Sequence, residues 1–239
     1  AAEDIVVGVT PFPHKDIMLA AKPLLAKEGY NLVIKEFTDY VQPNMALASK
    51  QLFANFFQHE PYLDNMNKEK KLDLVSIGKV HIEPLGVYSK KIKKLADLKK
   101  GNSVSVPNDP TNEARALRLL EANGVIAIKP GALVTVADIT KNPLGLKFHE
   151  LDAAQLPRTL DDVTASVINT NFAGEAGLVP SRDALVMEGS ESPYANIIVV
   201  RNEDKDSPKA KALMKAVQSP EVKEYIQKNL VERGIVPVF

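Results

Sequence analysis

The hydrophobic pattern at the start of the chain is that of a strand, a helix and a second strand. Residues 5–9 form an apolar, β-branched run, apolar positions then recur at helical spacing over 17–25, and 31–37 is a second strand-like run. A strand, a helix and a strand joined in this way favour parallel pairing through a right-handed crossover. The pattern therefore predicts an α/β fold for this region.

The pattern continues through the rest of the chain, and two stretches interrupt it. Near 81–89, Pro84 and Gly86 bend an otherwise extended run, and 192–200 is a second extended crossing. With 239 residues, the chain is long enough for two lobes of about 100 residues each. We predict lobe 1 at 1–82 plus 198–239 and lobe 2 at 83–197. Further strands are expected at 72–77, 103–106, 134–136, 146–151, 165–168 and 197–200, and further helices at 61–71, 113–123, 156–163, 207–218 and 220–233.

Composition excludes several classes of protein. Thirty basic residues balance 30 acidic ones, which argues against a nucleic-acid partner, because such binding needs clustered positive charge. The absence of Cys excludes disulfides, thiolate metal sites and thiol catalysis. No run of 18 apolar residues is present, so no membrane span is predicted. The abrupt start at Ala1 leads us to expect a mature exported protein.

Aromatic residues are concentrated between Tyr40 and Leu63. The chain has 6 Tyr, 8 Phe and no Trp. Most single aromatics fill cores, but Asn55, Gln58 and His59 are interleaved here, and ligand pockets are mostly apolar with a few placed polar groups. Pro61 also prevents the segment from continuing as one helix. We therefore prefer a ligand wall to a simple core cluster for this group of aromatics: Tyr40, Phe53, Phe56, Phe57 and Tyr62.

Two further positions carry candidate polar chemistry. Asp109 is a predicted N-cap with Pro110 in the first helical position, and Arg115 lies about one turn further on. A helix N-terminus beside a guanidinium accepts a carboxylate, although Arg115 could instead pair with Glu113 or Asp109 on the helix surface. Asn169 follows strand 165–168, and the carboxyl ends of parallel strands face the ligand crevice in open α/β sheets.

Motifs of catalysis are absent from the sequence. It contains no Gly-rich phosphate loop, no Gly-x-Ser-x-Gly and no His-Glu-x-x-His. The four histidines lie far apart, so no metal-ligand spacing can be read. We predict a binding protein rather than an enzyme, with no cofactor and no metal.

Several stretches together resemble one family. The segment from Tyr40 to Leu63 resembles the NlpA-type methionine-binding lipoproteins, which deliver substrate to ABC importers, and Phe53 stands where that family usually has Asp. The resemblance implies a two-lobed periplasmic-binding-protein fold of type II, with the ligand cleft between the lobes. Four further stretches match in order: His81 to Lys91, Val106 to Leu117, Ile168 to Asn171 and Ser192 to Ile198.

The resemblance also implies site residues and partners. The side-chain pocket of L-methionine would be formed by Tyr40, Phe57, His59 and Tyr62, the carboxylate partner would be Arg115, and Asn169 and Asn196 would hold the amino-acid backbone. The expected partners are an ABC importer permease and a membrane, reached through a palmitate-bearing Cys upstream after removal of a signal peptide. The protein would be a monomeric lipoprotein of the cell envelope, facing the periplasm or the cell exterior. Alternatives are a binder of another small apolar amino acid or a methionine-containing dipeptide, and an adhesion or interaction lipoprotein.

Overall fold

The chain divides into two compact units. The computed structural model describes residues 1–189 and 192–239, and unit 1 comprises Ala1–Glu83 and Glu191–Phe239, whereas unit 2 comprises Pro84–Ser190. The predicted lobe boundaries, 1–82 plus 198–239 and 83–197, differ from this division mainly at the second crossing. The reason is that strand β12 (Asn196–Arg201) already begins before residue 198 and pairs within the sheet of unit 1.

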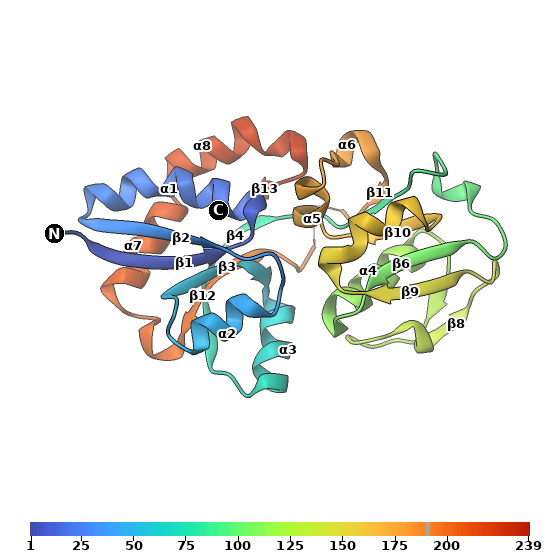
Figure 1. The fold of residues 1–239 in the computed structure, drawn as a ribbon, viewed down its shortest axis with the longest axis horizontal. Coiled ribbons are helices and arrows are strands. Elements are labelled where there is room, and N and C mark those ends of the chain that lie inside the picture. The colour runs from blue at the N-terminus through green and yellow to red at the C-terminus, as the bar shows by residue number, and fades with distance from the viewer. Residues whose placement is uncertain (190–191) are drawn as a thin grey trace. The chain divides into compact units, whose positions relative to one another are not determined.

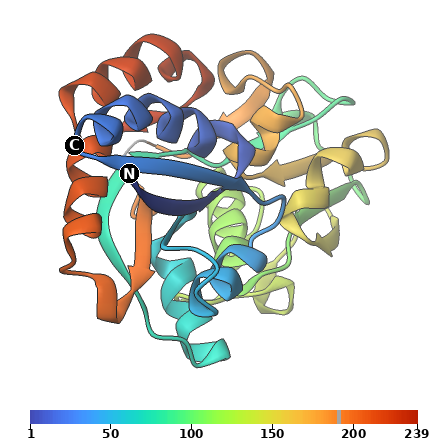
Figure 2. The ribbon, with the colours of Figure 1, turned by 60° about the vertical axis from the view of Figure 1, so that its left-hand side comes forward.

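Unit 1 is a sheet with helices on both faces (Figures 1 and 2). Its described strands are β1 (Glu3–Val9), β2 (Tyr30–Glu36), β3 (Ala54–His59), β4 (Leu74–Ile82), β12 and β13 (Val236–Pro237). Its described helices are α1 (Asp16–Lys27), α2 (Gln42–Ala48), α3 (Glu60–Lys70), α7 (Pro208–Val217) and α8 (Pro220–Asn229), with short helical turns at Pro11–Lys15, Asn202–Asp204 and Val231–Arg233.

The strand order of unit 1 shows which segments of the chain leave the sheet at the same end. Among the described residues the sheet has six strands in the order β13-β4-β12-β3-β1-β2. β1 is parallel to β2 and β3, and the returning strand β12 is antiparallel to both β3 and β4. Helices α1, α7 and α8 bury one face, and α2 and α3 lie on the other, as Figure 2 shows. Since β1 and β3 are parallel, the segments that follow them leave the sheet at the same end, beside the carboxyl ends of these strands.

Unit 2 has its own sheet and core. Its described strands are β5 (Gly86–Tyr88), β6 (Ser103–Pro107), β7 (Ala127–Ile128), β8 (Ile139–Lys141), β9 (Lys147–Leu151), β10 (Ala165–Ile168) and β11 (Ala184–Met187). Its described helices are α4 (Pro110–Ala122), α5 (Thr170–Glu175) and α6 (Pro180–Asp183), with 3₁₀ turns at Leu95–Asp97, Val136–Asp138 and Ala153–Asp161.

Parallel pairing again brings two chain segments to one edge. In the described part of unit 2, five strands have the order β11-β5-β10-β6-β9, and β7 and β8 form a separate pair. β6 is parallel to β9 and β10. Helix α4 follows β6 and packs Leu117 and Leu120 into the core, while Asn169 follows β10. The start of α4 and Asn169 thus lie at the carboxyl ends of neighbouring strands.

Several elements differ from the sequence prediction, including β7, β8, β11, β13, α2, α5 and α6, which were not predicted. The structure contains β3, which was not predicted, because the polar residues Asn55, Gln58 and His59 interrupt the apolar run that would predict a buried strand. Residues 134–136 were predicted as a strand, but Thr135 instead caps a 3₁₀ turn by accepting from the Ala137 N–H. The hydroxyl of Thr135 competes with strand formation at this position. Across residues 1–189 and 192–239, no helix has the length and apolar character needed to cross a membrane.

Candidate functional site

Three predicted aromatic residues form one group in unit 1. Phe57 and Tyr62 are buried, Tyr40 is half-buried, and the ring centroids lie 5.9 Å apart for Tyr40 and Phe57, 5.8 Å for Tyr40 and Tyr62, and 6.0 Å for Phe57 and Tyr62. These separations fall in the range of favourable aromatic pairs. The Tyr62 hydroxyl donates to the Tyr40 carbonyl at 2.7 Å. The aromatic group is therefore held by its own contacts.

His59 joins this group through helix α3. It is the N-cap of α3, and its Nδ1 accepts from the Tyr62 N–H at 3.1 Å. A His that accepts at Nδ1 carries a hydrogen on Nε2 when neutral. Tyr194 packs its ring against the His59 ring at 4.9 Å. Tyr194 was not among the predicted site residues, although it lies two positions before Asn196 in a stretch that carries the family resemblance.

Two residues predicted for the ligand wall brace the fold instead. Asn55 and Gln58 are buried and bond to Asn44 of α2: Asn44 Oδ1 accepts from Asn55 Nδ2 and from Gln58 Nε2, each at 2.8 Å. Gln58 Oε1 accepts from Asn44 Nδ2 at 2.9 Å, and Asn55 Oδ1 accepts from Gln58 Nε2 at 3.0 Å. The amide hydrogens of Gln58 are used within this network. The role of this hydrogen-bond network is to fix α2 against β3.

Asn196 begins β12 and is bound to a buried histidine. Its Oδ1 lies 2.7 Å from His14 Nε2, and His14 follows β1. Asn196 lies opposite His59 of β3 and His81 of β4 in the sheet register. The predicted residues Tyr40, Phe57, His59, Tyr62 and Asn196 are thus all in unit 1.

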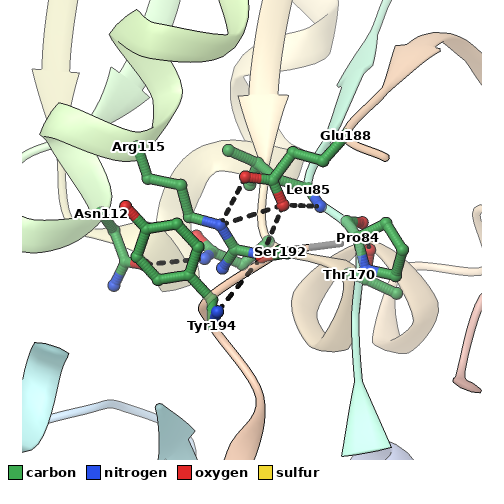
Figure 3. Close-up of polar contacts among 9 residues, drawn as sticks. Pro84, Leu85, Asn112, Arg115, Thr170, Glu188, Ser192 and Tyr194 are labelled. Atoms are coloured by element: carbon green, nitrogen blue, oxygen red, sulfur yellow. Dashed lines mark hydrogen bonds and ion pairs between the residues drawn. The ribbon is translucent and has the colours of Figure 1, made fainter. Parts of the chain in front are cut away.

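Arg115 of α4 in unit 2 is bound to an acidic partner that the sequence did not indicate. Glu188 accepts from Arg115 Nη2 at 2.6 Å and from Nε at 2.9 and 3.1 Å (Figure 3). The same carboxylate accepts from the Leu85 N–H at 2.8 Å. The side chains of Arg115 and Glu188 are 4% and 14% exposed. The ion pair is therefore with Glu188, and neither alternative, Glu113 nor Asp109, provides it.

Asn169 is oriented by a chain of hydrogen bonds from Asp109. Asp109 caps α4, as predicted, and its Oδ2 accepts from both the N–H and the Nδ2 of Asn112. Asn112 then turns its Oδ1 to Asn169 Nδ2 at 3.3 Å. In the described part of the structure the buried Oδ1 of Asn169 has no hydrogen-bond partner. A buried acceptor without a partner is costly, so this atom is well suited to a ligand donor.

One buried cluster in unit 1 has the residue types of a metal site. His14, His81 and Glu83 bring one potential ligand atom each within 4.8 Å of the others. The distances to Glu83 Oε2 are 2.6 Å from His81 Nε2 and 3.0 Å from His14 Nε2. Two ligands of one tetrahedral zinc ion lie about 3.3 Å apart, given metal–ligand distances of about 2.0 Å. The separations in this cluster are those of hydrogen bonds.

Comparison with known proteins assigns the family. The model of the family described as NlpA lipoprotein matches residues 5–239. This chain belongs to the NlpA lipoprotein family. A solved structure confirms the two-lobed α/β fold expected from the resemblance. It is that of a nutrient binding protein from Burkholderia cenocepacia bound to methionine, which matches this chain with a TM-score of 0.95 and 51% identity. The match covers 98% of this chain and 100% of that one.

Two curated relatives of this NlpA-family chain are similarly close. Outer membrane lipoprotein 3 of Mannheimia haemolytica is 48% identical over 226 residues, covering 92% of this chain and 85% of the relative. The D-methionine-binding lipoprotein MetQ of Salmonella typhi is 46% identical over 230 residues, covering 94% and 84%. The similarity extends over both units.

Proposed function

We propose that this NlpA-family chain is the extracytoplasmic substrate-binding lipoprotein of an ABC importer, that it binds L-methionine, and that it delivers this amino acid to the membrane permease. Relatives named for methionine binding support the assignment. The observation that carries it lies within each unit. Unit 1 has an aromatic group and the oriented amide of Asn196, and unit 2 has the oriented side chains of Arg115 and Asn169.

The aromatic group fits the methionine side chain. Tyr40, Phe57, Tyr62 and the His59 ring offer aromatic surface. An unbranched thioether adapts to such a surface and gains from sulfur–aromatic contact. Burying a side chain of this size contributes about 1.5–3 kcal/mol. We therefore assign these four residues to the side chain of the ligand.

The polar groups fit the main-chain groups of the ligand. Arg115 is assigned to the carboxylate, with Glu188 holding its guanidinium in a fixed plane. Asn196 is assigned to the carboxylate as a second donor. Asn169 Oδ1 is assigned to the ammonium group, because its own Nδ2 is directed to Asn112. Donors for one end and an acceptor for the other distinguish an amino acid from a plain carboxylic acid.

Calorimetry on protein that has been unfolded and refolded to remove carried-over ligand tests the proposal. L-methionine should bind with a stoichiometry near one, and mass spectrometry should recover it unchanged, as for a carrier. L-norleucine, L-alanine, D-methionine and a methionine-containing dipeptide serve as competitors. Tighter binding of L-alanine or of the dipeptide would replace the ligand assignment. No heat and no thermal shift at millimolar L-methionine would refute it and favour an adhesion or interaction lipoprotein.

The cellular setting is part of the same proposal. Relatives are named lipoproteins, which supports a membrane-anchored place in the cell envelope. We further propose a monomer that faces the periplasm or the cell exterior and carries a lipid-bearing Cys upstream. One acyl chain anchors only weakly, so more than one is expected. Expression of the full-length gene with a labelled fatty acid tests this, and a wholly soluble, unlabelled product would contradict it. Light scattering measures the oligomeric state.

A further inference from the structure

Asn196 has a donor end and an acceptor end, and the end that faces a ligand decides which ligand group it binds. An amide oxygen would attract an ammonium group, whereas an amide NH₂ would attract a carboxylate. The contacts of Asn196 within unit 1 decide between these. The relevant neighbours are Thr10, His14, His81 and Glu83, all of which are buried.

Glu83 is the charged end of this network. Burial by itself raises the pKa of Glu83, but the hydrogen bonds and charges of His14 and His81 outweigh it and hold that pKa well below its usual range. The carboxylate is therefore ionised and can only accept. Its Oε2 lies 2.6 Å from His81 Nε2 and 3.0 Å from His14 Nε2. Both nitrogens must then carry a hydrogen, because a bare imidazole nitrogen would face the carboxylate with a lone pair.

The hydrogen on His14 Nε2 determines which end of the Asn196 amide lies against His14. Its Nε2 faces two oxygens, Glu83 Oε2 and Asn196 Oδ1, the second at 2.7 Å. Its other nitrogen, Nδ1, lies 2.6 Å from the Thr10 hydroxyl, and the ring packs edge-on against Phe56 at 4.6 Å. The imidazole is thus fixed on three sides. An N–H at Nε2 requires the oxygen of Asn196, and not its NH₂, on the inner side.

We propose that His14, held by Glu83 and Thr10, is a positioning residue that fixes the Asn196 amide with Oδ1 inward, so that Nδ2 is presented as a donor to the ligand carboxylate. The proposal rests on the proposed binding of an amino acid. It assigns to His14 an indirect role in recognition. It also gives a role to two buried residues, His14 after β1 and Glu83 after β4.

Two substitutions of His14 separate positioning from packing. His14→Gln keeps an N–H close to the position of Nε2, whereas His14→Met has a similar volume and no donor. Hydrogen bonds to charged groups are worth enough that losing one weakens binding by about 10-fold to 100-fold. We expect His14→Met to weaken L-methionine binding within this range and His14→Gln to stay within about threefold of the wild type. Urea unfolding of each ligand-free variant is measured in parallel.

The outcomes are distinct. An L-methionine affinity of His14→Met within twofold of the wild type would overturn the proposal. It would also be overturned if both variants lost the same affinity and the same unfolding free energy. A ligand-free readout is available from long-range ¹H–¹⁵N correlation spectra of protein labelled at His, with His14 assigned from the His14→Gln spectrum. We expect Nε2 to be protonated, and a bare Nε2 would overturn the inference. If the wild-type protein does not bind L-methionine, the proposed function fails, whatever the tautomer of His14.

Discussion

Substitution of Arg115 by Ala tests the carboxylate site most directly. Arg115 is 4% exposed and shares three hydrogen bonds with the Glu188 carboxylate. An arginine that merely lined a solvated surface would contribute about 0–1 kcal/mol to folding. The observed pair changes this expectation, because the substitution leaves a nearly buried carboxylate without its cation. Binding and folding should therefore both be affected.

The two magnitudes can be estimated separately. Removing one partner of a desolvated, hydrogen-bonded charge pair costs about 2–5 kcal/mol of binding free energy, which weakens L-methionine binding by about 30-fold to several thousand-fold. Breaking a buried ion pair costs about 3–5 kcal/mol of unfolding free energy. We expect the low end for Arg115→Ala, because Glu188 is 14% exposed and keeps its bond from the Leu85 N–H.

A second variant separates these two effects. Glu188→Gln removes the negative charge and keeps an oxygen for the Leu85 N–H. The double variant Arg115→Ala/Glu188→Gln should therefore be more stable in urea unfolding than Arg115→Ala by at least about 1 kcal/mol, while its affinity for L-methionine stays as low. A folded Arg115→Ala protein that binds L-methionine within twofold of the wild type would remove Arg115 from the site. A double variant no more stable than Arg115→Ala would refute the role of the Glu188 charge.

Two further substitutions test the surroundings of the site. Burial and a hydrogen bond with Glu150 raise the pKa of Glu113 to about 8, so the folded protein holds an extra proton and its unfolding free energy should fall as pH rises from about 4.5 to 8. The unfolding free energy of Glu113→Gln, measured with urea, should equal that of the wild type at pH 5 and exceed it by at least about 1 kcal/mol at pH 9. The same difference in unfolding free energy at both pH values would contradict this. Gln58→Leu removes the bonds of Asn44 Nδ2 and Asn55 Oδ1 to Gln58 and should lower the unfolding free energy by about 2–4 kcal/mol. The L-methionine affinity of the folded protein should be nearly unchanged. A large loss of affinity at intact stability would instead assign Gln58 to the ligand.

Local signals in the sequence were enough to predict most elements of the fold. The cap at Asp109 was predicted from its residue type and from the proline that follows it, and its side chain accepts from the N–H three residues on. The central strand β3 escaped prediction because the polar residues Asn55, Gln58 and His59 interrupt its apolar run, whereas β10 and β12 are also buried and were predicted from apolar runs. Caps depend on a few neighbouring residues, whereas the burial of a central strand depends on the whole sheet.

The partners of the site residues could not be predicted in the same way. Arg115 was identified from its place after a helix start, but Glu188 lies 73 residues away in sequence. The contact between His14 and Asn196 spans 182 residues. One sequence without an alignment carries no signal for such pairs, so the alternative partners considered for Arg115 were only the nearby Glu113 and Asp109. The fold alone brings these partners together.

The two asparagines proposed to hold the ligand differ in their partners. The family resemblance treats Asn169 and Asn196 alike, as amides that would hold an amino-acid backbone. In unit 2, Asp109 accepts from Asn112, which accepts from Asn169, and the remaining group of Asn169 is an acceptor. In unit 1, His14 donates to Asn196, and the remaining group of Asn196 is a donor. Each series of hydrogen bonds begins at a carboxylate, Asp109 in unit 2 and Glu83 in unit 1. The two series leave different groups of the asparagines available, because in unit 1 the N–H of His14 lies between two acceptors, Glu83 and Asn196. Under the proposed binding of an α-amino acid, the acceptor of Asn169 would meet the ammonium group and the donor of Asn196 the carboxylate, so two identical side chains would serve opposite charges.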